Sequence, residues 1–226
     1  MELINEDLAR RVVLDSDAMQ WTASPQPGVD RKVLESLDPK TERVTTIVRF
    51  APDSYFPEHG HDGGEEFIVL EGVFSDEDGD YPAGSYVRNP PGSSHKPFTR
   101  EGCTILVKLW QFGEDDLAAV RIDTNSVQWY PGLVDGLSVL PLHEHDGVNT
   151  ALVSWDPHTR FNPHSHPGGE EILVLKGMFC DEFGEYRKGT WIRNPRDSRH
   201  RPFNGEEGAL IYVRVGQLGS VLIGQD

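Results

Sequence analysis

The sequence predicts an all-β protein built from two tandem copies of one small antiparallel sandwich or barrel. Short runs rich in Val, Ile and Phe alternate with Gly-, Pro- and Asp-containing turns, as in chains of many short strands. The 3.6-residue apolar period of amphipathic helices is largely missing. One long segment occurs twice, and the 226 residues are enough for two ordinary domains.

The internal repeat is the clearest feature of the chain. Residues 56–98 recur as residues 161–203 at a constant offset of 105 without a gap, and 23 of these 43 positions are identical. We interpret this as the duplication of a whole folding unit. A polar stretch at 113–124 separates the copies, which predicts one module at residues 1–115 and a second at residues 116–226.

Each copy contains four runs typical of β-strands, separated by turn sequences such as Asp78-Gly79-Asp80. Two further segments, 6–13 and 114–120, are compatible with short helices. The expected strands are 43–50, 66–74, 84–88 and 104–110 in the first copy, and 150–155, 171–179, 189–193 and 209–215 in the second.

The composition argues against several classes of protein. The net charge is 21 − 37 = −16, and so acidic a surface repels phosphate backbones, which argues against direct nucleic-acid binding. The apolar runs fall far short of the roughly 20 residues of a membrane helix, and residues 1–17 contain no apolar signal-peptide core. We therefore expect a cytoplasmic protein without a membrane segment. The two cysteines, Cys103 and Cys180, provide no disulfide framework, and we expect buried, inert thiols.

A pattern of metal-binding residue types occurs once in each copy. His59 and His61 occupy alternate positions, which face the same way on a strand, and Glu65 and His95 follow in the same copy. Three neutral imidazoles and one carboxylate suit Zn, Fe(II), Mn, Ni or Cu(II). A single HxH pair is often an ordinary surface or packing feature, but its recurrence with the glutamate and the distant histidine favours a metal site. The second copy repeats the pattern as His164, His166, Glu170 and His200.

Other repeated residues lie beside the expected ligands. By parity, Glu66 and Glu171 fall on the opposite strand face, so we expect solvated or outer-sphere carboxylates there. The alternative that Glu66 is the metal ligand in place of Glu65 stays open. The pairs Arg88-Asn89 and Arg193-Asn194 are equally compatible with hydrogen bonding to metal ligands and with a structural role at a strand end.

These motifs resemble a known family. The pattern HxH-x3-E-x6-G, followed by G-x5-PxG-x2-H, closely resembles the two cupin motifs, although Asp197 replaces the glycine of PxG in the second copy. The segments GGEE, VLEG, F-x-DE-x-G-x-Y and RNPPGSSH resemble the ChrR-type cupin-like domain, and the resemblance covers most of the chain as two modules. It implies conical jelly-roll β-barrels that hold metal through the eight residues named above.

The resemblance implies two kinds of function. The ChrR anti-sigma factor is zinc-dependent, and its cupin part responds to singlet oxygen or peroxide, which implies zinc, a role in stress-responsive transcription, and a sigma factor or another regulatory protein as partner. The His-x3-Cys-x2-Cys motif of its sigma-binding domain does not occur in this sequence. Four protein ligands can close a zinc tetrahedron, and a closed site is structural or switch-like.

A similar cupin is an iron-dependent dioxygenase that cleaves β-diketones. The resemblance therefore also implies, as the alternative, a dioxygenase-type enzyme that uses Fe(II), Mn or Ni on a small organic substrate. A third hypothesis is a cupin that binds a small molecule or mediates homodimers, with metal serving stability alone. All three hypotheses allow up to two metal ions per chain. Of the first two, the sequence favours the sensor over the enzyme.

Overall fold

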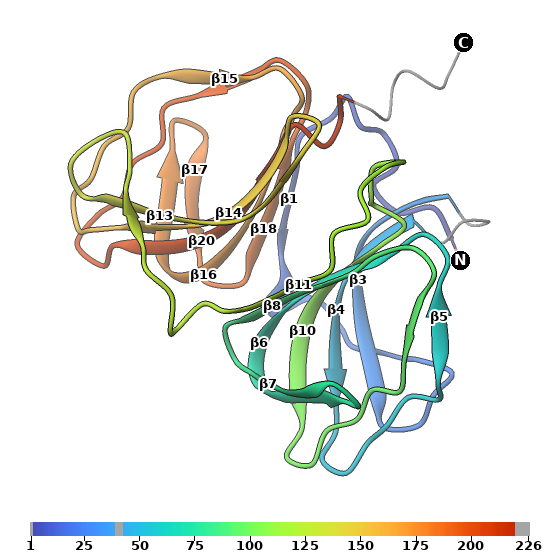
Figure 1. Ribbon diagram of the computed structural model, residues 1–226. Coiled ribbons are helices and arrows are strands. Elements are labelled where there is room, and N and C mark those ends of the chain that lie inside the picture. Colours follow the sequence, from blue (N-terminus) through green and yellow to red (C-terminus); the bar gives the residue numbers. More distant parts are fainter. Residues whose placement is uncertain (1, 39–42, 220–226) are drawn as a thin grey trace. The chain divides into compact units, whose positions relative to one another are not determined.

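The computed structural model describes residues 2–38 and 43–219 (Figure 1). In these ranges the chain forms twenty β-strands and a single 3-10 turn, η1 (Ser16–Ala18), which confirms the all-β prediction. The helices expected at 6–13 and 114–120 do not form, because both segments lead directly into edge strands. No helix of the described part is long and apolar enough to cross a membrane.

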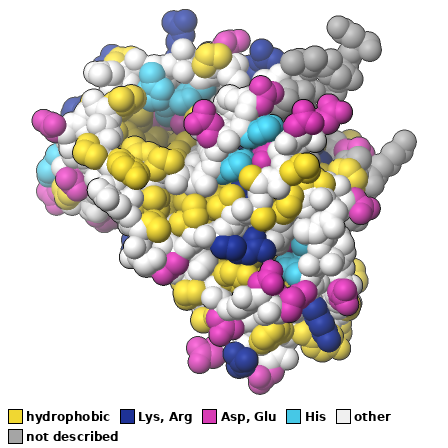
Figure 2. Space-filling view, viewed as in Figure 1, with side chains coloured by type: hydrophobic (Ala, Val, Ile, Leu, Met, Phe, Trp, Pro, Cys, Tyr) yellow, Lys and Arg dark blue, Asp and Glu magenta, His cyan; other side chains and the backbone are white. Residues whose placement is uncertain are grey.

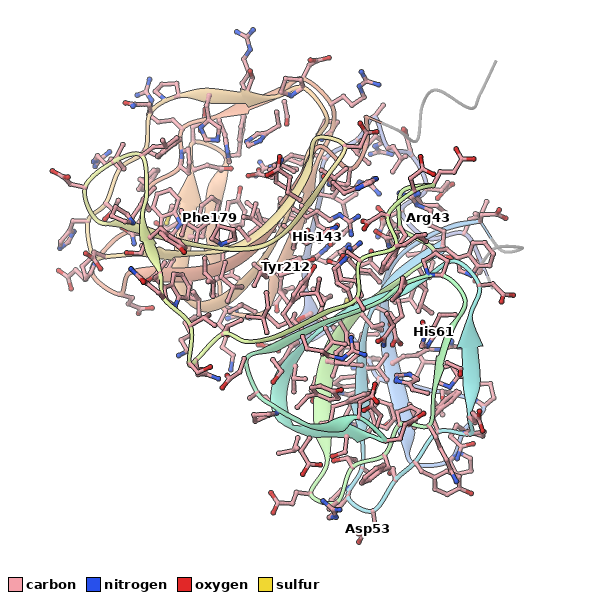
Figure 3. The ribbon with its side chains drawn as sticks, viewed as in Figure 1. Arg43, Asp53, His61, His143, Phe179 and Tyr212 are labelled. Carbon is pink, nitrogen blue, oxygen red and sulfur yellow. The ribbon has the colours of Figure 1, made fainter. Side chains whose placement is uncertain are left out.

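The chain divides into two compact units. The N-terminal unit comprises Met1–Glu6 and Met19–Val127, and the C-terminal unit comprises Asp7–Ala18 and Gln128–Asp226. Each unit contains one large antiparallel sheet of eight strands and one small sheet of two strands. Figure 3 shows His61 inside the N-terminal unit and Phe179 inside the C-terminal unit.

The large sheet of the N-terminal unit has the strand order β11-β8-β6-β10-β4-β3-β2, and β7 pairs with the far half of β6. Strands β5 and β9 form the small sheet. The bounds are β2 (Thr22–Ala23), β3 (Val29–Asp38), β4 (Arg43–Phe50), β5 (His59–His61), β6 (Glu65–Asp76), β7 (Gly79–Pro82), β8 (Ser85–Asn89), β9 (Ser93–His95), β10 (Cys103–Leu109) and β11 (Val120–Asp123).

The C-terminal unit repeats this topology as β1-β18-β16-β20-β14-β13-β12, with β17 on β16 and with β15 and β19 as the small sheet. The bounds are β1 (Val12–Asp15), β12 (Tyr130–Pro131), β13 (Leu137–His145), β14 (Val148–Trp155), β15 (His164–His166), β16 (Glu170–Asp181), β17 (Gly184–Arg187), β18 (Thr190–Asn194), β19 (Ser198–His200) and β20 (Ala209–Val215).

The two repeats exchange their edge strands. Strand β1 precedes the first repeat, yet it pairs with β18 through Val13 and Ile192, while β11 pairs with β8 through Arg121 and Val87. Pairing covers the edges that β8 and β18 would otherwise expose. As a result, the structural units differ from the sequence division at 115/116, since 7–18 joins the C-terminal unit and 116–127 the N-terminal one.

Alternation along the strands builds an apolar core in each unit. In β6, Phe67 and Val69 face the core of the N-terminal unit together with Ile105 and Val107 of β10. Glu65 begins the same inward-facing row as Phe67 and Val69. The strand therefore places this carboxylate at the end of an apolar interior, as the sequence predicts.

The last glycine of the first motif has a steric role. Gly72 and Gly177 have φ of +72° and +67°, a region that side chains rarely adopt. A Cβ atom on either residue would collide with the carbonyl oxygen of Gly102 or Gly208, beside the bulge where β6 meets β10 or β16 meets β20. Only glycine fits these two positions without displacing backbone.

Gly177→Ala should lower the free energy of unfolding by about 1–3 kcal/mol, because it adds both backbone strain and a clash with the main chain. Gly205→Ala is the matched control, since a Cβ there meets no atom of the described residues within 4 Å. Urea denaturation of both variants measures the difference. Equal stabilities would contradict the assigned steric role.

Candidate metal centres

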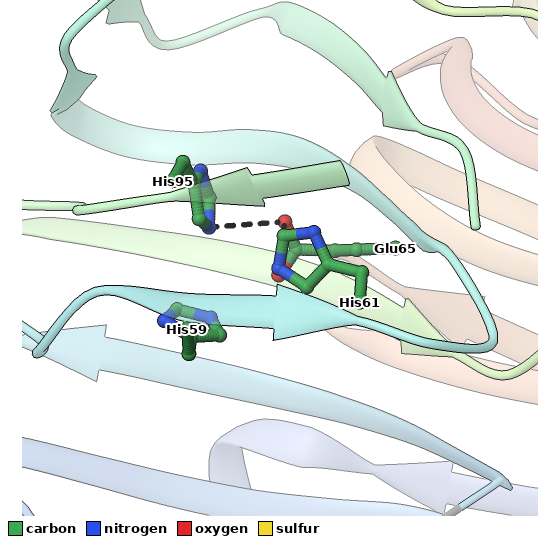
Figure 4. A group of neighbouring side chains, drawn as sticks. All are labelled: His59, His61, Glu65 and His95. Atoms are coloured by element: carbon green, nitrogen blue, oxygen red, sulfur yellow. Dashed lines mark ion pairs between the residues drawn. The ribbon is translucent and has the colours of Figure 1, made fainter. Parts of the chain in front are cut away.

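The N-terminal unit gathers its four predicted ligands at one point (Figure 4). Strand pairing between β5 and β9 sets His59 opposite His95, and alternation places His61 on the same face as His59. After a short turn, Glu65 opens β6 beside them. One donor atom from each residue lies within 4.8 Å of all the others, and all of these residues except the half-buried His59 are buried.

The distances suit one ion. The Oε2 atom of Glu65 lies 3.5 Å from the Nε2 atoms of both His61 and His95. Donors held at about 2.0–2.1 Å from a common ion are about 2.8–3.4 Å apart, from cis-octahedral to tetrahedral angles. A contraction of a few tenths of an ångström would therefore bring these two pairs to the spacing of donors around one ion.

Hydrogen bonds orient the three imidazoles of this site. The Nδ1 atoms of His59, His61 and His95 lie 2.9, 3.2 and 3.3 Å from Pro57 O, Ser93 Oγ and Asp76 Oδ2. Because Ser93 Oγ already donates to the carbonyl of Pro90, it accepts from the protonated Nδ1 of His61.

That tautomer leaves an Nε2 lone pair at the centre of the group. The Nε2 atoms of His61 and His95 are buried, and besides the 3.5 Å contacts with Glu65 they have no hydrogen-bond partner among residues 2–38 and 43–219. Buried polar atoms without partners are rare and call for an explanation. A cation at the centre would satisfy these atoms, so the residues present fit a divalent ion.

The C-terminal unit gathers His164, His166, Glu170 and His200 in the same way. The Nε2 atom of His200 lies 3.2 Å from that of His164 and 3.1 Å from that of His166. Glu170 places Oε1 3.4 Å from His166 Nε2 and Oε2 3.7 Å from His200 Nε2. Three of these separations match the ligand spacing around one ion, and the fourth, from Glu170 to His200, exceeds it by a few tenths of an ångström.

The electrostatics keep several ligands ready to coordinate. Burial lowers the pKa values of His61, His164 and His166, which favours the neutral imidazole that a metal needs. Burial also acts to lower the pKa of His95, but the hydrogen bond with Asp76 and the charge of Glu65 outweigh it and raise that pKa. An ion at this site would have to displace a proton from His95 more often than from His61.

The repeated Arg-Asn pairs divide between two roles. Asn89 donates from Nδ2 to Glu65 Oε2 at 2.9 Å, and Asn194 donates to Glu170 Oε2 at 2.8 Å, so both asparagines orient candidate ligands. Arg88 lies on the other side of the strand and pairs with Asp116 at 2.7 Å. The asparagines thus have the outer-sphere role and Arg88 the structural one.

The sequence correctly placed Glu66 and Glu171 on the strand face opposite Glu65 and Glu170, but neither carboxylate is solvated. They are only 2% and 3% exposed, because Arg88 Nε donates to Glu66 at 3.2 Å and Trp191 Nε1 donates to Glu171 at 2.8 Å. Both face away from the histidine groups, so Glu65 and Glu170 are the carboxylates beside the imidazoles.

Two aspartates were missed by the sequence analysis. Asp76 Oδ2 lies 3.3 Å from His95 Nδ1, and Asp181 Oδ2 lies 3.6 Å from His200 Nδ1. Tyrosine hydroxyls hold each carboxylate, and Arg11 forms an additional ion pair of 2.8 Å with Asp181. The sequence could have pointed to them, because both aspartates belong to the F-x-DE-x-G-x-Y segment, which occurs in both copies.

The cavities in front of the two groups differ in size. The N-terminal cavity has a volume of 460 Å³ and is lined by all four predicted ligands of that unit. The C-terminal cavity has 160 Å³ and a mostly apolar lining that includes His164, Glu170 and His200. Figure 2 shows hydrophobic side chains around a hollow in the C-terminal unit, with histidine at its edge.

One strained residue lies at the larger cavity. Trp110, which lines it, has φ +59° and is 40% exposed, and its ring packs directly on Gly63 of the turn before Glu65. At the corresponding place in the C-terminal unit, Gly168 meets the backbone of Gly216. Strain of this kind costs of order 1–3 kcal/mol and clusters at functional sites.

Comparison with known proteins identifies the family. The ChrR cupin-like domain matches residues 9–113 and, a second time, residues 117–219. The chain belongs to the ChrR cupin-like domain family. The resemblance inferred from the motifs is therefore confirmed, and the two matches lie on either side of the sequence division at 115/116. No curated protein matches this member of the family.

Solved structures share the duplicated cupin fold at low sequence identity. A proposed dioxygenase from Nostoc punctiforme is 17% identical with a TM-score of 0.77, covering 92% of this chain and 82% of that one. Protein YlbA from E. coli is 18% identical with a TM-score of 0.71, covering 96% and 95%. Oxalate decarboxylase from Bacillus subtilis is 14% identical with a TM-score of 0.63, covering 90% and 75%.

Protein purified without chelator should contain about two divalent ions per chain, one for each histidine group. His95→Ala and His200→Ala should each remove about one ion, because either change deletes one ligand of a single group. Inductively coupled plasma mass spectrometry measures the content. An unchanged metal content in either variant would count against the site concerned.

Asp76→Asn should weaken metal binding at the N-terminal site roughly 10–100-fold, because it removes the carboxylate that orients His95. The measurement is a competition titration with a chromophoric chelator in a His200→Ala background, which isolates that site. Asp53→Asn is the control, because Asp53 is exposed and lies at the far end of the N-terminal unit from His61 (Figure 3). Equal affinities of the two variants would refute the role of Asp76.

Proposed function

We propose that this chain is a metal-dependent enzyme that acts on a small organic molecule in its N-terminal barrel, with a dioxygenase-type reaction as the class. The observation that carries the proposal is the 460 Å³ cavity lined by His59, His61, Glu65 and His95. This volume falls within the roughly 300–1,000 Å³ range of small-molecule sites. A closed structural metal site needs no such cavity.

The ligand set supports the same proposal. Four protein ligands leave two positions of an octahedral ion open, and Fe(II), Mn or Ni bound there would supply Lewis-acid and redox chemistry. The chain itself supplies the surroundings. Apolar side chains such as Val48, Ile105 and Val107 line the cavity, and Asn89 holds the Glu65 carboxylate in place.

We infer a supporting role for the C-terminal site. Its cavity of 160 Å³ is too small for most organic substrates, while its four predicted ligands are as close together as those of the first site. A bound ion there would stabilise the fold of the second barrel. Two structural neighbours carry enzymatic descriptions, a proposed dioxygenase and an oxalate decarboxylase, which agrees with an enzyme but rests on likeness of fold.

A zinc-dependent sensor, with a sigma factor or another regulatory protein as partner, is the second candidate. The compact C-terminal group favours it, since four protein ligands without a substrate cavity suit a closed zinc site. Sensing would fall on the metal ligands, because both cysteines are buried and burial raises the pKa of Cys103 to about 11. A thiol in that state is a poor target for oxidants.

Metal identity and oxygen consumption separate the two candidates. The enzyme proposal expects iron, manganese or nickel in the purified protein and oxygen uptake on a panel of small organic compounds that includes β-diketones, flavonols and apolar carboxylic acids. His95→Ala should abolish this uptake, whereas His200→Ala should retain it and lower the melting temperature. Stoichiometric zinc with no turnover on the panel would instead support the sensor.

A further inference from the structure

Among the described residues, an arginine side chain lines the N-terminal cavity, and no arginine or lysine lines the C-terminal one. Arg31 lies on β3 and lines the cavity, opposite Val48 of β4. The corresponding position on β13, opposite Val153, is Val139. At equivalent positions of the two copies, the larger cavity is therefore lined by the guanidinium of Arg31 and the smaller one by the isopropyl group of Val139.

Arg31 has no partner of its own in the described structure. Its half-buried side chain makes no hydrogen bond or ion pair with any residue in 2–38 or 43–219. Arg49 and Arg88 of the same unit are both paired, with Asp30 at 2.7 Å and with Asp116 at 2.7 Å. A guanidinium offers five N–H donors and no acceptor, so a half-buried one beside a cavity favours an anionic ligand there.

The charge of the cavity also favours an anion. With a divalent ion present, the formal charges of the ion, Glu65 and Arg31 sum to +2 − 1 + 1 = +2. The corresponding sum for the C-terminal cavity, with Glu170, is +2 − 1 = +1. Asp62 also lines the N-terminal cavity, but it is exposed to solvent and therefore screened.

The other residues that line the N-terminal cavity indicate the chemistry of the rest of the ligand. The residues around Arg31 are mostly aliphatic and aromatic, among them Val29, Val33, Phe56 and Leu109. Such a wall contacts an apolar body better than a second charged group, because burying an unpaired charge is costly. A ligand that suits the whole cavity carries one anionic group and an apolar remainder.

We propose that the N-terminal cavity binds a small organic monocarboxylate with an apolar body, whose carboxylate is held by the Arg31 guanidinium. The planar fork of arginine matches a carboxylate through two parallel hydrogen bonds. The proposal rests on the proposed function in placing the substrate in this cavity, and it assigns that substrate to the carboxylic acids. Arg31 is a binding residue and takes no part in metal ligation.

Isothermal titration calorimetry with benzoate as the probe tests this assignment, with its neutral analogue benzamide as the comparison. Metal-loaded wild-type protein should bind benzoate more tightly than benzamide. Arg31→Leu should weaken benzoate binding about 10–150-fold, the usual value of hydrogen bonds to a charged group, and leave benzamide binding unchanged. Arg49→Leu is the matched control, because Arg49 is exposed and pairs with Asp30.

Arg31→Gln serves as a second variant that keeps a polar side chain in the cavity. Both variants should contain two ions per chain and melt at the temperature of the wild-type protein, which shows that they are folded and metal-loaded. Equal benzoate affinity in wild type and both Arg31 variants would overturn the proposal, since the ion alone would then hold the anion. So would the absence of benzoate binding, or equal affinity for benzamide. This readout does not depend on turnover, so a failed oxygen-uptake assay would count against the enzyme alone.

Discussion

The convergence of three imidazole nitrogens and one carboxylate on a single buried point is the constraint on which each barrel depends. In the N-terminal unit, outer hydrogen bonds fix the histidine rings so that unpartnered lone pairs meet beside Glu65. Such an arrangement is unfavourable without a cation and stable with one. The short β5–β9 sheet, the start of β6 and Asn89 all hold these donors in place.

Duplication kept this ligand arrangement and changed what surrounds it. Both copies retain the histidines, the glutamate, the asparagine and the outer aspartate. The walls have diverged, with Arg31 against Val139 and Trp110 against Gly216 at corresponding places. Because the ligands are alike and the cavities differ, the differences in volume and charge favour separate roles for the two sites.

The sequence predicted those strands and ligand positions that depend on neighbouring residues alone. Strand β4 matches the expected 43–50, because a run of β-branched residues is sufficient for a strand, and the HxH spacing placed two imidazoles on one face. Strand β3 was not predicted, since Lys32 and Glu35 interrupt its apolar pattern, although both are buried in the fold. The exchange of β1 and β11 and the burial of Glu66 against Arg88 depend on partners distant in sequence, which a repeat pattern does not reveal.

Anomalous X-ray diffraction from crystals of the metal-loaded protein tests the central claim most directly. The account predicts two anomalous peaks per chain, each about 2.0–2.2 Å from three histidine Nε2 atoms and one glutamate oxygen of the same barrel. Peaks confined to surface carboxylates, or histidine groups that stay without a peak in the presence of excess metal, would contradict it.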